Sequence, residues 1–183
     1  MKRNYLQKIH KSSTRDPLKR MIDNKVACMT TARKFGKDFW DGKRKFGYGG
    51  YKYIEGYWAP VAKKMIKDYS LSNKSKILDI GCGKGFLLYE FKKLLPDISI
   101  YGYDISKYAI KNAKTEIKHN LFVHPAEKKT KFNKNYFDLA FSLATFHNLH
   151  LKDLIFSLKE IKRISKKSYI MVESYRNNKE LFN

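Results

Sequence analysis

The chain has 183 residues, which is enough for one domain with a sizeable core and too few for two full domains. Its 39 Lys and Arg against 17 Asp and Glu give a formal net charge of +22, but 43% hydrophobic and 15% aromatic residues exclude a disordered polybasic chain. No apolar run approaches the ~20 residues of a membrane span, and no signal peptide is visible. Two cysteines are too few for a disulfide framework, which favours a reducing, cytoplasmic location.

The first part of the chain differs in character from the rest. Residues 1–58 are basic and aromatic and include a Gly- and Tyr-rich stretch, Gly47-Tyr48-Gly49-Gly50-Tyr51. Residues 1–35 show no clean period, although residues 17–29 would suit a helix. A helix is predicted from Ala59, because Pro60 lies in its first turn, where the missing N–H costs nothing. We therefore predict an N-terminal helical or irregular extension, or lid, over residues 1–58 and a domain over 59–183.

Beyond that helix, apolar runs alternate with amphipathic stretches. Short apolar runs predict buried strands, and apolar residues at helical spacing predict helices. The predicted strands span residues 76–80, 99–104, 121–124, 136–142 and 169–173. The predicted helices span residues 86–95, 106–117 and 152–164, with a link between the third and fourth strands too polar to assign. This alternation is typical of an α/β three-layer sandwich with a mainly parallel sheet of about five strands.

The most informative motif is the glycine-rich turn Asp79-Ile80-Gly81-Cys82-Gly83-Lys84-Gly85, between the first strand and a helix. Such a turn lets a ligand approach the backbone closely and meet exposed helix N–H groups. Phe86 stands where the dinucleotide-binding fingerprint has its third glycine, so a nicotinamide or flavin dinucleotide is disfavoured. The turn also lacks the Gly-Lys-Ser/Thr of a P-loop, so it is not a phosphate-binding loop of that kind. Asp104 ends the second strand, where a carboxylate can accept both hydroxyls of a ribose.

In combination these features resemble the class I S-adenosylmethionine (SAM)-dependent methyltransferases over roughly residues 59–175. The family's first motif is similar to residues 77–85, its adenine-bordering segment to 124–127, and its fourth strand and following loop to 137–149. The resemblance implies a Rossmann-like fold, with SAM as the cofactor and S-adenosylhomocysteine as the product.

The same resemblance implies roles for individual residues. It implies that Asp79 orients the amino acid end of SAM, that Asp104 holds the ribose, and that Ser142 approaches the methionine part. The implied cofactor site consists of Asp79, Gly81, Cys82, Gly83, Gly85, Asp104, Ile105, Ala126, Glu127 and Ser142, with Ala126 and Glu127 beside the adenine.

The Gly- and Tyr-rich stretch resembles a block that precedes the first motif in a subset of these enzymes, some associated with surface-polysaccharide or sugar pathways. Flexible backbone and flat aromatic faces suit a lid or substrate contacts through Tyr48, Tyr51 and Tyr53. A turn whose tyrosines pack on the sheet explains the pattern equally well.

His147 is the candidate general base, because it follows the fourth strand at the carboxyl edge of the sheet and a histidine titrates near neutrality. A loop histidine that packs locally is the alternative. Cys82 stands where the turn needs a small residue, so a nucleophilic role is disfavoured. The five histidines and two cysteines show no metal-ligand spacing.

Two departures from the family pattern bear on the partners. Family sheets continue with a further helix and a two-stranded hairpin, whereas this chain stops at Asn183, so we expect a truncated chain, completion by another chain, or a reduced fold. The exposed sheet edge favours a homodimer or poor solubility. The second departure is that Ser142-Leu143-Ala144-Thr145 stands where many enzymes that methylate amino groups of bases or glutamine have Asn/Asp-Pro-Pro-Tyr/Phe. Methylation of an exocyclic amino group of a base is therefore disfavoured.

The net charge has a plain explanation besides nucleic-acid binding. The basic residues are 32 Lys and only seven Arg, although Arg is preferred for bidentate phosphate recognition, and the profile fits an AT-rich coding sequence. We therefore expect a SAM-dependent methyltransferase that acts through an O- or N-nucleophile on a small-molecule or sugar-like acceptor. The alternatives are an RNA methyltransferase with a basic arm over residues 1–45 and a SAM-binding module without catalysis.

Overall fold

The computed structural model describes Tyr5 and residues 24–172. These residues fall into two compact units, the first ending at Tyr53 and the second spanning Ile54–Val172, and each unit is described by itself. Within the described ranges, no helix has the length and apolar character needed to cross a membrane.

The first unit contains three short helices in its described part. They are α3 (Lys25–Ala32), α4 (Lys37–Asp41) and the 3-10 helix η1 (Arg44–Phe46). Of the predicted helix over residues 17–29, the last five residues belong to α3, and residues 17–23 lie outside the described part of the chain.

The Gly- and Tyr-rich stretch of this unit packs on Trp40, which is 5% exposed. The ring of Tyr48 stacks on that of Trp40 with centroids 5.2 Å apart, and Tyr51 lies 4.6 Å from Tyr48. The backbone N–H of Tyr48 donates to the carbonyl of Phe39, which closes the predicted turn. Tyr48 and Tyr51 are therefore part of an aromatic cluster within their own unit.

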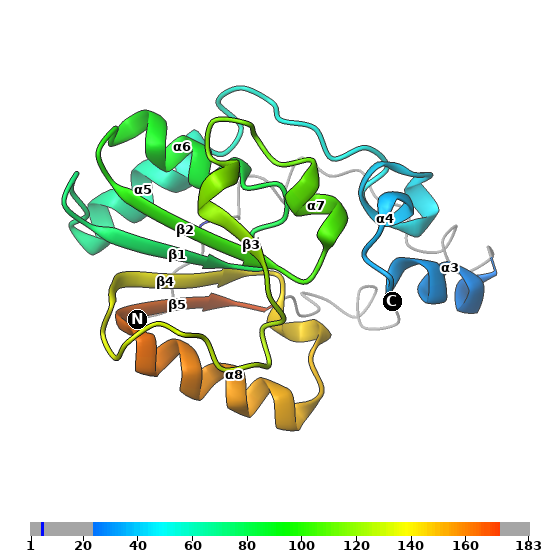
Figure 1. Cartoon of the computed structure of the whole chain (residues 1–183). Helices are drawn as coiled ribbons and strands as arrows, with labels where there is room; N and C mark the ends of the chain where they lie inside the picture. The colour runs from blue at the N-terminus through cyan, green and yellow to red at the C-terminus, as the bar shows by residue number, and fades with distance from the viewer. Residues whose placement is uncertain (1–4, 6–23, 173–183) are drawn as a thin grey trace. The chain divides into compact units, whose positions relative to one another are not determined.

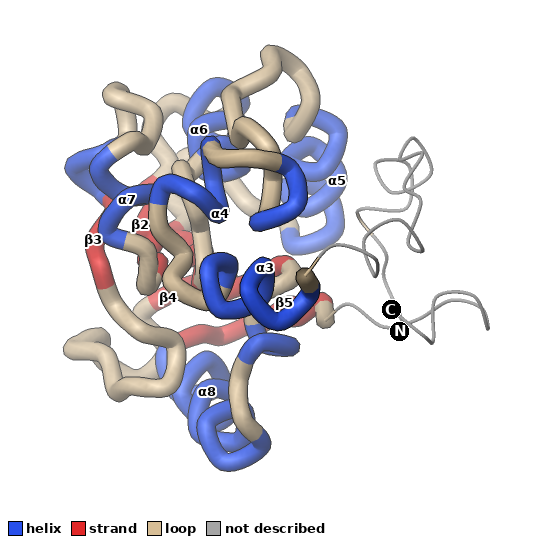
Figure 2. The backbone as a smooth tube through the Cα atoms, turned by 90° about the vertical axis from the view of Figure 1, so that its right-hand side faces the viewer, coloured by secondary structure: helices blue, strands red, loops and turns tan. Residues whose placement is uncertain are grey.

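The second unit is built around a five-stranded parallel sheet with strand order β3-β2-β1-β4-β5. Its strands are β1 (Lys76–Ile80), β2 (Ser99–Asp104), β3 (Leu121–Val123), β4 (Phe137–Leu143) and β5 (Ser165–Met171). Its helices are α5 (Ala59–Tyr69), α6 (Phe86–Leu94), α7 (Lys107–Lys111), η2 (Lys118–Asn120), η3 (Phe146–Asn148) and α8 (Leu151–Ile164). Helices α5 and α6 cover one face of the sheet and α8 covers the other (Figures 1 and 2). The predicted α/β three-layer architecture is therefore confirmed.

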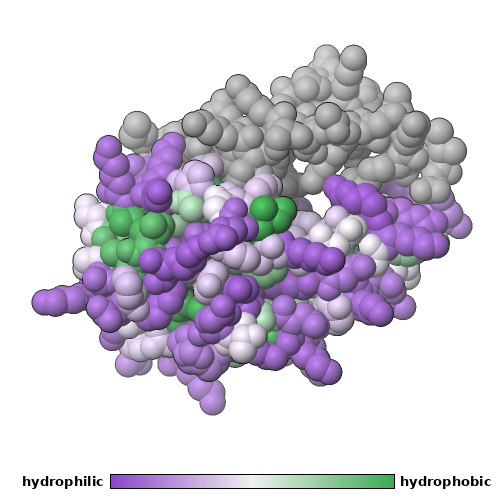
Figure 3. Space-filling view, turned by 90° about the horizontal axis from the view of Figure 1, so that it is seen from above, coloured by the Kyte–Doolittle hydropathy of each residue, from purple (hydrophilic) through white to green (hydrophobic). Residues whose placement is uncertain are grey.

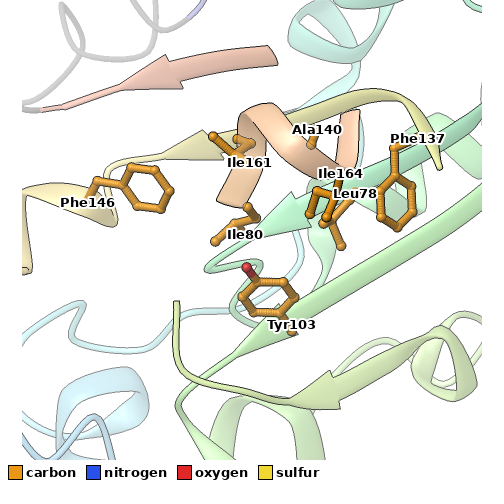
Figure 4. Close-up of a cluster of buried hydrophobic side chains, with 8 residues drawn as sticks. All are labelled: Leu78, Ile80, Tyr103, Phe137, Ala140, Phe146, Ile161 and Ile164. Atoms are coloured by element: carbon orange, nitrogen blue, oxygen red, sulfur yellow. The ribbon is translucent and has the colours of Figure 1, made fainter. Parts of the chain in front are cut away.

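One core cluster of this unit fills the space between the sheet and α8. Apolar side chains of β1, β2 and β4 meet those of α8 there, and Phe146 of η3 closes the cluster at the carboxyl end of the sheet (Figure 4). Buried residues of α5 and α6, such as Met65 and Phe91, form the core on the other face. The described surface seen from the α5 and α6 side is mainly hydrophilic, with small hydrophobic patches (Figure 3). This division between core and surface is what the alternating pattern of the sequence requires.

Two elements differ from the sequence prediction, and the link that the sequence left unassigned is irregular. The helix predicted over residues 106–117 ends at Lys111, where the backbone N–H and the side chain of the C-cap residue Asn112 both donate to the Tyr108 carbonyl. The fifth strand begins at Ser165 rather than at 169, directly after α8, and its polar start pairs with β4 while its lysines are exposed. The link over residues 124–136 contains neither helix nor strand.

Candidate functional site

The glycine-rich turn leaves the carboxyl end of β1 in a backbone conformation that favours glycine. Gly81 and Gly83 have φ values of +79° and +57°, in the left-handed region. A Cβ atom at Gly81 would also lie only 2.0 Å from Oγ1 of Thr145, which follows β4. The backbone N–H of Gly81 donates to the carbonyl of Tyr103 over 2.8 Å, which fixes the turn to β2.

Asp104 lies at the carboxyl end of β2 and is 8% exposed. One of its carboxylate oxygens accepts from the N–H of Gly83 (2.9 Å) and the other from the N–H of Ser106 (2.8 Å). The Ser106 hydroxyl in turn accepts from the N–H of Ala109 over 3.0 Å, so Ser106 is the N-cap of α7. Each oxygen keeps acceptor capacity for further donors, such as the two hydroxyls of a ribose.

Asp79, at the carboxyl end of β1, is buried without such support. It is 5% exposed, and its carboxylate has no hydrogen bond or ion pair to any residue that the structure describes. Burial, and then the charge of Asp104, raise the pKa of Asp79 well above its ordinary value. A buried carboxylate without a partner favours a cationic ligand, because a positive charge offsets the solvation by water that the carboxylate loses on burial.

Cys82 shares this environment. Burial raises the pKa of the Cys82 thiol, and the charges of Asp79 and Asp104 raise it further. A thiol held protonated is a poor nucleophile. Its sulfur packs close to Gly102, where a Cβ atom would lie 2.9 Å away. The residue therefore fills space in the turn, as the sequence indicated.

The segment after β4 brings the second group of predicted residues to the same edge. Ser142 is fully buried, and its hydroxyl donates to the carbonyl of Ile80, so this hydroxyl links β4 to β1. Ala144 has a φ of +55°, which is unusual for a residue with a side chain. Phe146 anchors η3 in the core, and His147 beside it is exposed. The roles proposed for Ser142 and His147 toward a ligand stay predictions.

The segment after β3 lies beside Asp104. The backbone N–H of His124 donates to the carbonyl of Asp104 over 3.1 Å. Ala126 and Glu127 follow and are half-buried, while Ile105, on the other side of Asp104, is 52% exposed. The structure thus places the predicted residues of the second unit along one edge of the sheet. Tyr48, Tyr51 and Tyr53 belong to the first unit.

Sequence reasoning missed three residues, one at this edge and two on α8. Thr145 covers Gly81, and Ser157 and Glu160 of α8 bind the segment after β3. Polar residues at positions 157 and 160, beside the apolar positions 161 and 164, were a readable signal of a buried polar contact on α8. The contact of Thr145 with a glycine 64 positions earlier left no such signal.

The arrangement fits a ligand that combines a cation with a ribose. Asp79 offers an unpartnered carboxylate, the turn offers close backbone approach, and Asp104 offers acceptors held by two amides. Among the described residues, no three His, Cys, Asp or Glu side chains gather as a metal site would require.

Comparison with known proteins adds independent evidence. Residues 71–183 match the family model described as a methyltransferase domain. An uncharacterised methyltransferase of Schizosaccharomyces pombe is 30% identical over 114 residues, which are 61% of this chain and 40% of that protein. A protein of Methanococcus maripaludis, assigned as an S-adenosyl-L-methionine-dependent methyltransferase, is 25% identical with a TM-score of 0.53, over 62% of this chain and 54% of that chain.

The fold is shared more widely. A SAM-dependent methyltransferase of Aquifex aeolicus is 24% identical with a TM-score of 0.51, over 66% of this chain and 70% of that chain. The chain therefore spans about half the length of the first solved structure and less of the curated relative. Because the family model covers more than half of the chain, the chain belongs to the class I SAM-dependent methyltransferase family.

Proposed function

We propose that this protein binds SAM at the carboxyl edge of β1, β2 and β4 and transfers its methyl group to a small-molecule or sugar-like acceptor. The observation that carries the proposal is Asp79, which is 5% exposed and has no partner in the described part of the chain. SAM carries an ammonium group and a sulfonium, so its charge matches a buried carboxylate that lacks a cation.

We propose that different residues at this edge bind different parts of SAM. Asp79 would hold the amino acid end, and the turn at Gly81, Gly83 and Gly85 lets the backbone approach it. Asp104, held by the N–H groups of Gly83 and Ser106, would accept the ribose hydroxyls. Ala126 and Glu127 follow the strand next to Asp104 and would lie beside the base, which the hydrogen bond from His124 to the Asp104 carbonyl supports.

When bound, SAM supplies a methyl group that is already activated by the positive sulfur. The chain's own contribution is therefore to orient the two reactants and, for an O–H or N–H acceptor, to remove a proton. His147 is exposed next to the buried anchor Phe146, on the segment that follows β4. We propose that its imidazole accepts the proton of the acceptor group.

The proposed acceptor class follows from the segment after β4. Ser142-Leu143-Ala144-Thr145 provides neither the amide nor the proline pair that many enzymes use for planar amino groups, which supports an O- or non-base N-nucleophile. RNA is retained as a tested alternative, because residues 24–53 carry eight basic and two acidic residues.

Turnover with methyl-labelled SAM separates these possibilities. The protein is incubated with a small-molecule extract or with total RNA. Asp104→Ala, which removes the ribose contact and the acceptor of the Gly83 and Ser106 amides, is the control, and its melting curve checks that it is folded. Label in small molecules supports the proposal. Label in RNA that falls steeply with added salt would replace the proposed acceptor by RNA. SAM binding without label in either pool would indicate a module that binds SAM without catalysis.

We also propose that the outer edge of β5 associates with a second copy of the chain. β5 pairs with β4 on one side and with no other strand among the described residues. Unpaired edges promote association, although Lys166 and Lys167 on this strand oppose it. For location, the two free cysteines support the cytoplasm as a proposal.

A further inference from the structure

Three polar side chains of α8 hold the segment that follows β3. The Ser157 hydroxyl contacts the carbonyl of Ala126 over 3.0 Å, and the Arg163 guanidinium donates to the carbonyl of Phe132 over 2.8 Å. Between them, Glu160 accepts from Thr130. These residues stand at positions 157, 160 and 163, so they lie near one face of the helix.

Glu160 is the centre of this contact. It is 5% exposed, and one of its oxygens accepts from both the N–H and the hydroxyl of Thr130, each over 2.8 Å. Nε of Arg163 donates to its other oxygen over 2.8 Å, and Nη2 donates to the first over 2.7 Å. Four donors therefore converge on one buried carboxylate, which makes the contact charge-assisted and specific in geometry.

The carboxylate stays charged across the physiological range. Partial burial raises the pKa of Glu160, but the hydrogen bonds from Arg163 and Thr130 lower it further, to about 2. The contact between α8 and Thr130 therefore does not switch with pH near neutrality.

The conformation of residues 124–136 depends on contacts with other parts of the chain. Residues 124–136 form neither helix nor strand, so their backbone groups are not satisfied by a regular ladder. The segment begins at His124, whose N–H donates to the carbonyl of Asp104. Its course past Ala126 and Glu127 is thus fixed at one end by β2 and along its length by α8.

We propose that Ser157, Glu160 and Arg163 are positioning residues for the base of the cofactor. They act through the carbonyl of Ala126 and through Thr130, which set where residues 126 and 127 stand relative to Asp104. This inference rests on the proposed function, because it assumes that a ribose binds Asp104 and that the attached base lies beside the next strand. Helix α8 contributes no direct ligand contact in this account.

A purely structural role is the competing explanation, so the test needs a matched control. Ser165 provides one: it is buried like Ser157, and its hydroxyl donates to the carbonyl four residues earlier, that of Ile161, over 2.7 Å. Ser157 also contacts the carbonyl four residues earlier, that of Asp153, over 2.8 Å, but it adds the contact to Ala126. Ser157→Ala and Ser165→Ala should therefore lower the melting temperature to a similar extent.

The two variants differ in what they do to SAM binding, measured by calorimetry on the full chain. Ser157→Ala should raise the Kd for SAM about 3- to 10-fold, the cost of one hydrogen bond, and Ser165→Ala should leave it unchanged. Glu160→Gln should raise the Kd by roughly 10- to 100-fold, as for other residues that orient ligand-contacting groups. Thr130→Ser keeps the hydroxyl and should bind SAM like wild type, while Thr130→Val should not.

Amide hydrogen exchange without SAM gives a second measurement, because Ser157→Ala should speed exchange at residues 126–130 and Ser165→Ala should not. Equal Kd values for the two serine variants would overturn the positioning role, as would wild-type affinity of a folded Glu160→Gln protein. A failure of wild-type protein to bind SAM would instead overturn the proposed function, so the two failures are distinguishable.

Discussion

Replacing Asp79 by asparagine should stabilise the ligand-free protein and weaken its binding of SAM. Asp79 is buried, lacks a partner among the described residues, and lies near the charge of Asp104. Burial and that neighbouring charge raise its pKa in the folded protein above the value in the unfolded chain. In the window between these two values the folded state binds more protons, so stability falls as pH rises through the window and stays lower above it.

The size of the effect follows from the cost of burying a polar group without a partner. Such a group costs about 1–3 kcal/mol, and more when it is charged. An asparagine side chain has nearly the same shape and also stays unpaired, but it carries no charge. We therefore expect Asp79→Asn to relieve only the part of the cost that comes from the charge, about 1 kcal/mol or more above the raised pKa. For a chain of this length each kcal/mol shifts Tm by about 2–4 °C. The gain should vanish below about pH 4, where the carboxyl group is protonated in both states.

The same substitution removes the carboxylate that faces the cation of SAM. Hydrogen bonds to charged groups contribute about 1.5–3 kcal/mol, so the Kd for SAM should rise roughly 10- to 150-fold. In the wild-type protein, SAM binding should weaken as pH falls through the raised pKa of Asp79, because protonation neutralises the site.

The assay combines thermal unfolding over a pH series with calorimetric titration of SAM, and Asp138→Asn serves as the control. Asp138, at the start of β4, accepts from the N–H of Lys76 and from Nζ of Lys166, each over 2.8 Å. Partial burial raises the pKa of Asp138, but these hydrogen bonds lower it overall. Its stabilising contribution is present above the ordinary pKa and lost as pH falls, which is the opposite sign.

Asp138→Asn should therefore lower stability at neutral pH by at most about 1 kcal/mol and leave the Kd for SAM unchanged. An Asp79→Asn protein that is less stable than wild type at neutral pH, or that binds SAM as tightly, would refute the reasoning about the buried carboxylate.

Three further predictions concern the turn, the base and the sheet edge. Gly81→Ala should lower the free energy of unfolding by at least about 1–3 kcal/mol and abolish SAM binding, because φ is +79° and Thr145 occupies the space of a Cβ atom. Gly36→Ala is the control, because no atom lies within 4 Å of its Cβ position, and it should do neither. Melting curves measure the stability of both variants, and calorimetry measures their SAM binding. His147→Gln should lower kcat by roughly 100-fold or more with an unchanged Kd for SAM, and an unchanged kcat would exclude a proton acceptor. Sedimentation should show dimers or larger species formed through β5, and a monodisperse monomer would count against that edge.

The sheet could be predicted because its strands are short apolar runs separated by strong turn signals. The turn from Asp79 to Gly85 could be predicted because three glycines directly follow the end of a strand. Their positive φ values show why glycine is needed there. Asp104 was recognisable from its place at the end of the next strand. The site was thus readable where local sequence and strand order carry the information.

The missed features depend on contacts that local sequence does not encode. The predicted helix over residues 106–117 was too long because Ala113 and Ile117 continue the apolar helical spacing beyond Lys111, where the helix ends. The start of β5 was missed because Lys166 and Lys167 lie on a sheet edge, where apolar alternation is not required. The position of Glu160 among apolar residues of α8 indicates a buried polar contact, but its partner Thr130 lies 30 positions away, and no periodicity reveals that partner.

Calorimetric titration of the full chain with SAM, for wild type and Asp104→Ala, tests the central claim most directly. Asp104 accepts from two backbone amides and stands where the ribose hydroxyls would bind. Wild-type protein should bind one SAM per chain, and Asp104→Ala should lose at least about tenfold in affinity, the equivalent of one charge-assisted hydrogen bond. No binding by folded wild-type protein, or equal binding by the variant, would contradict the account.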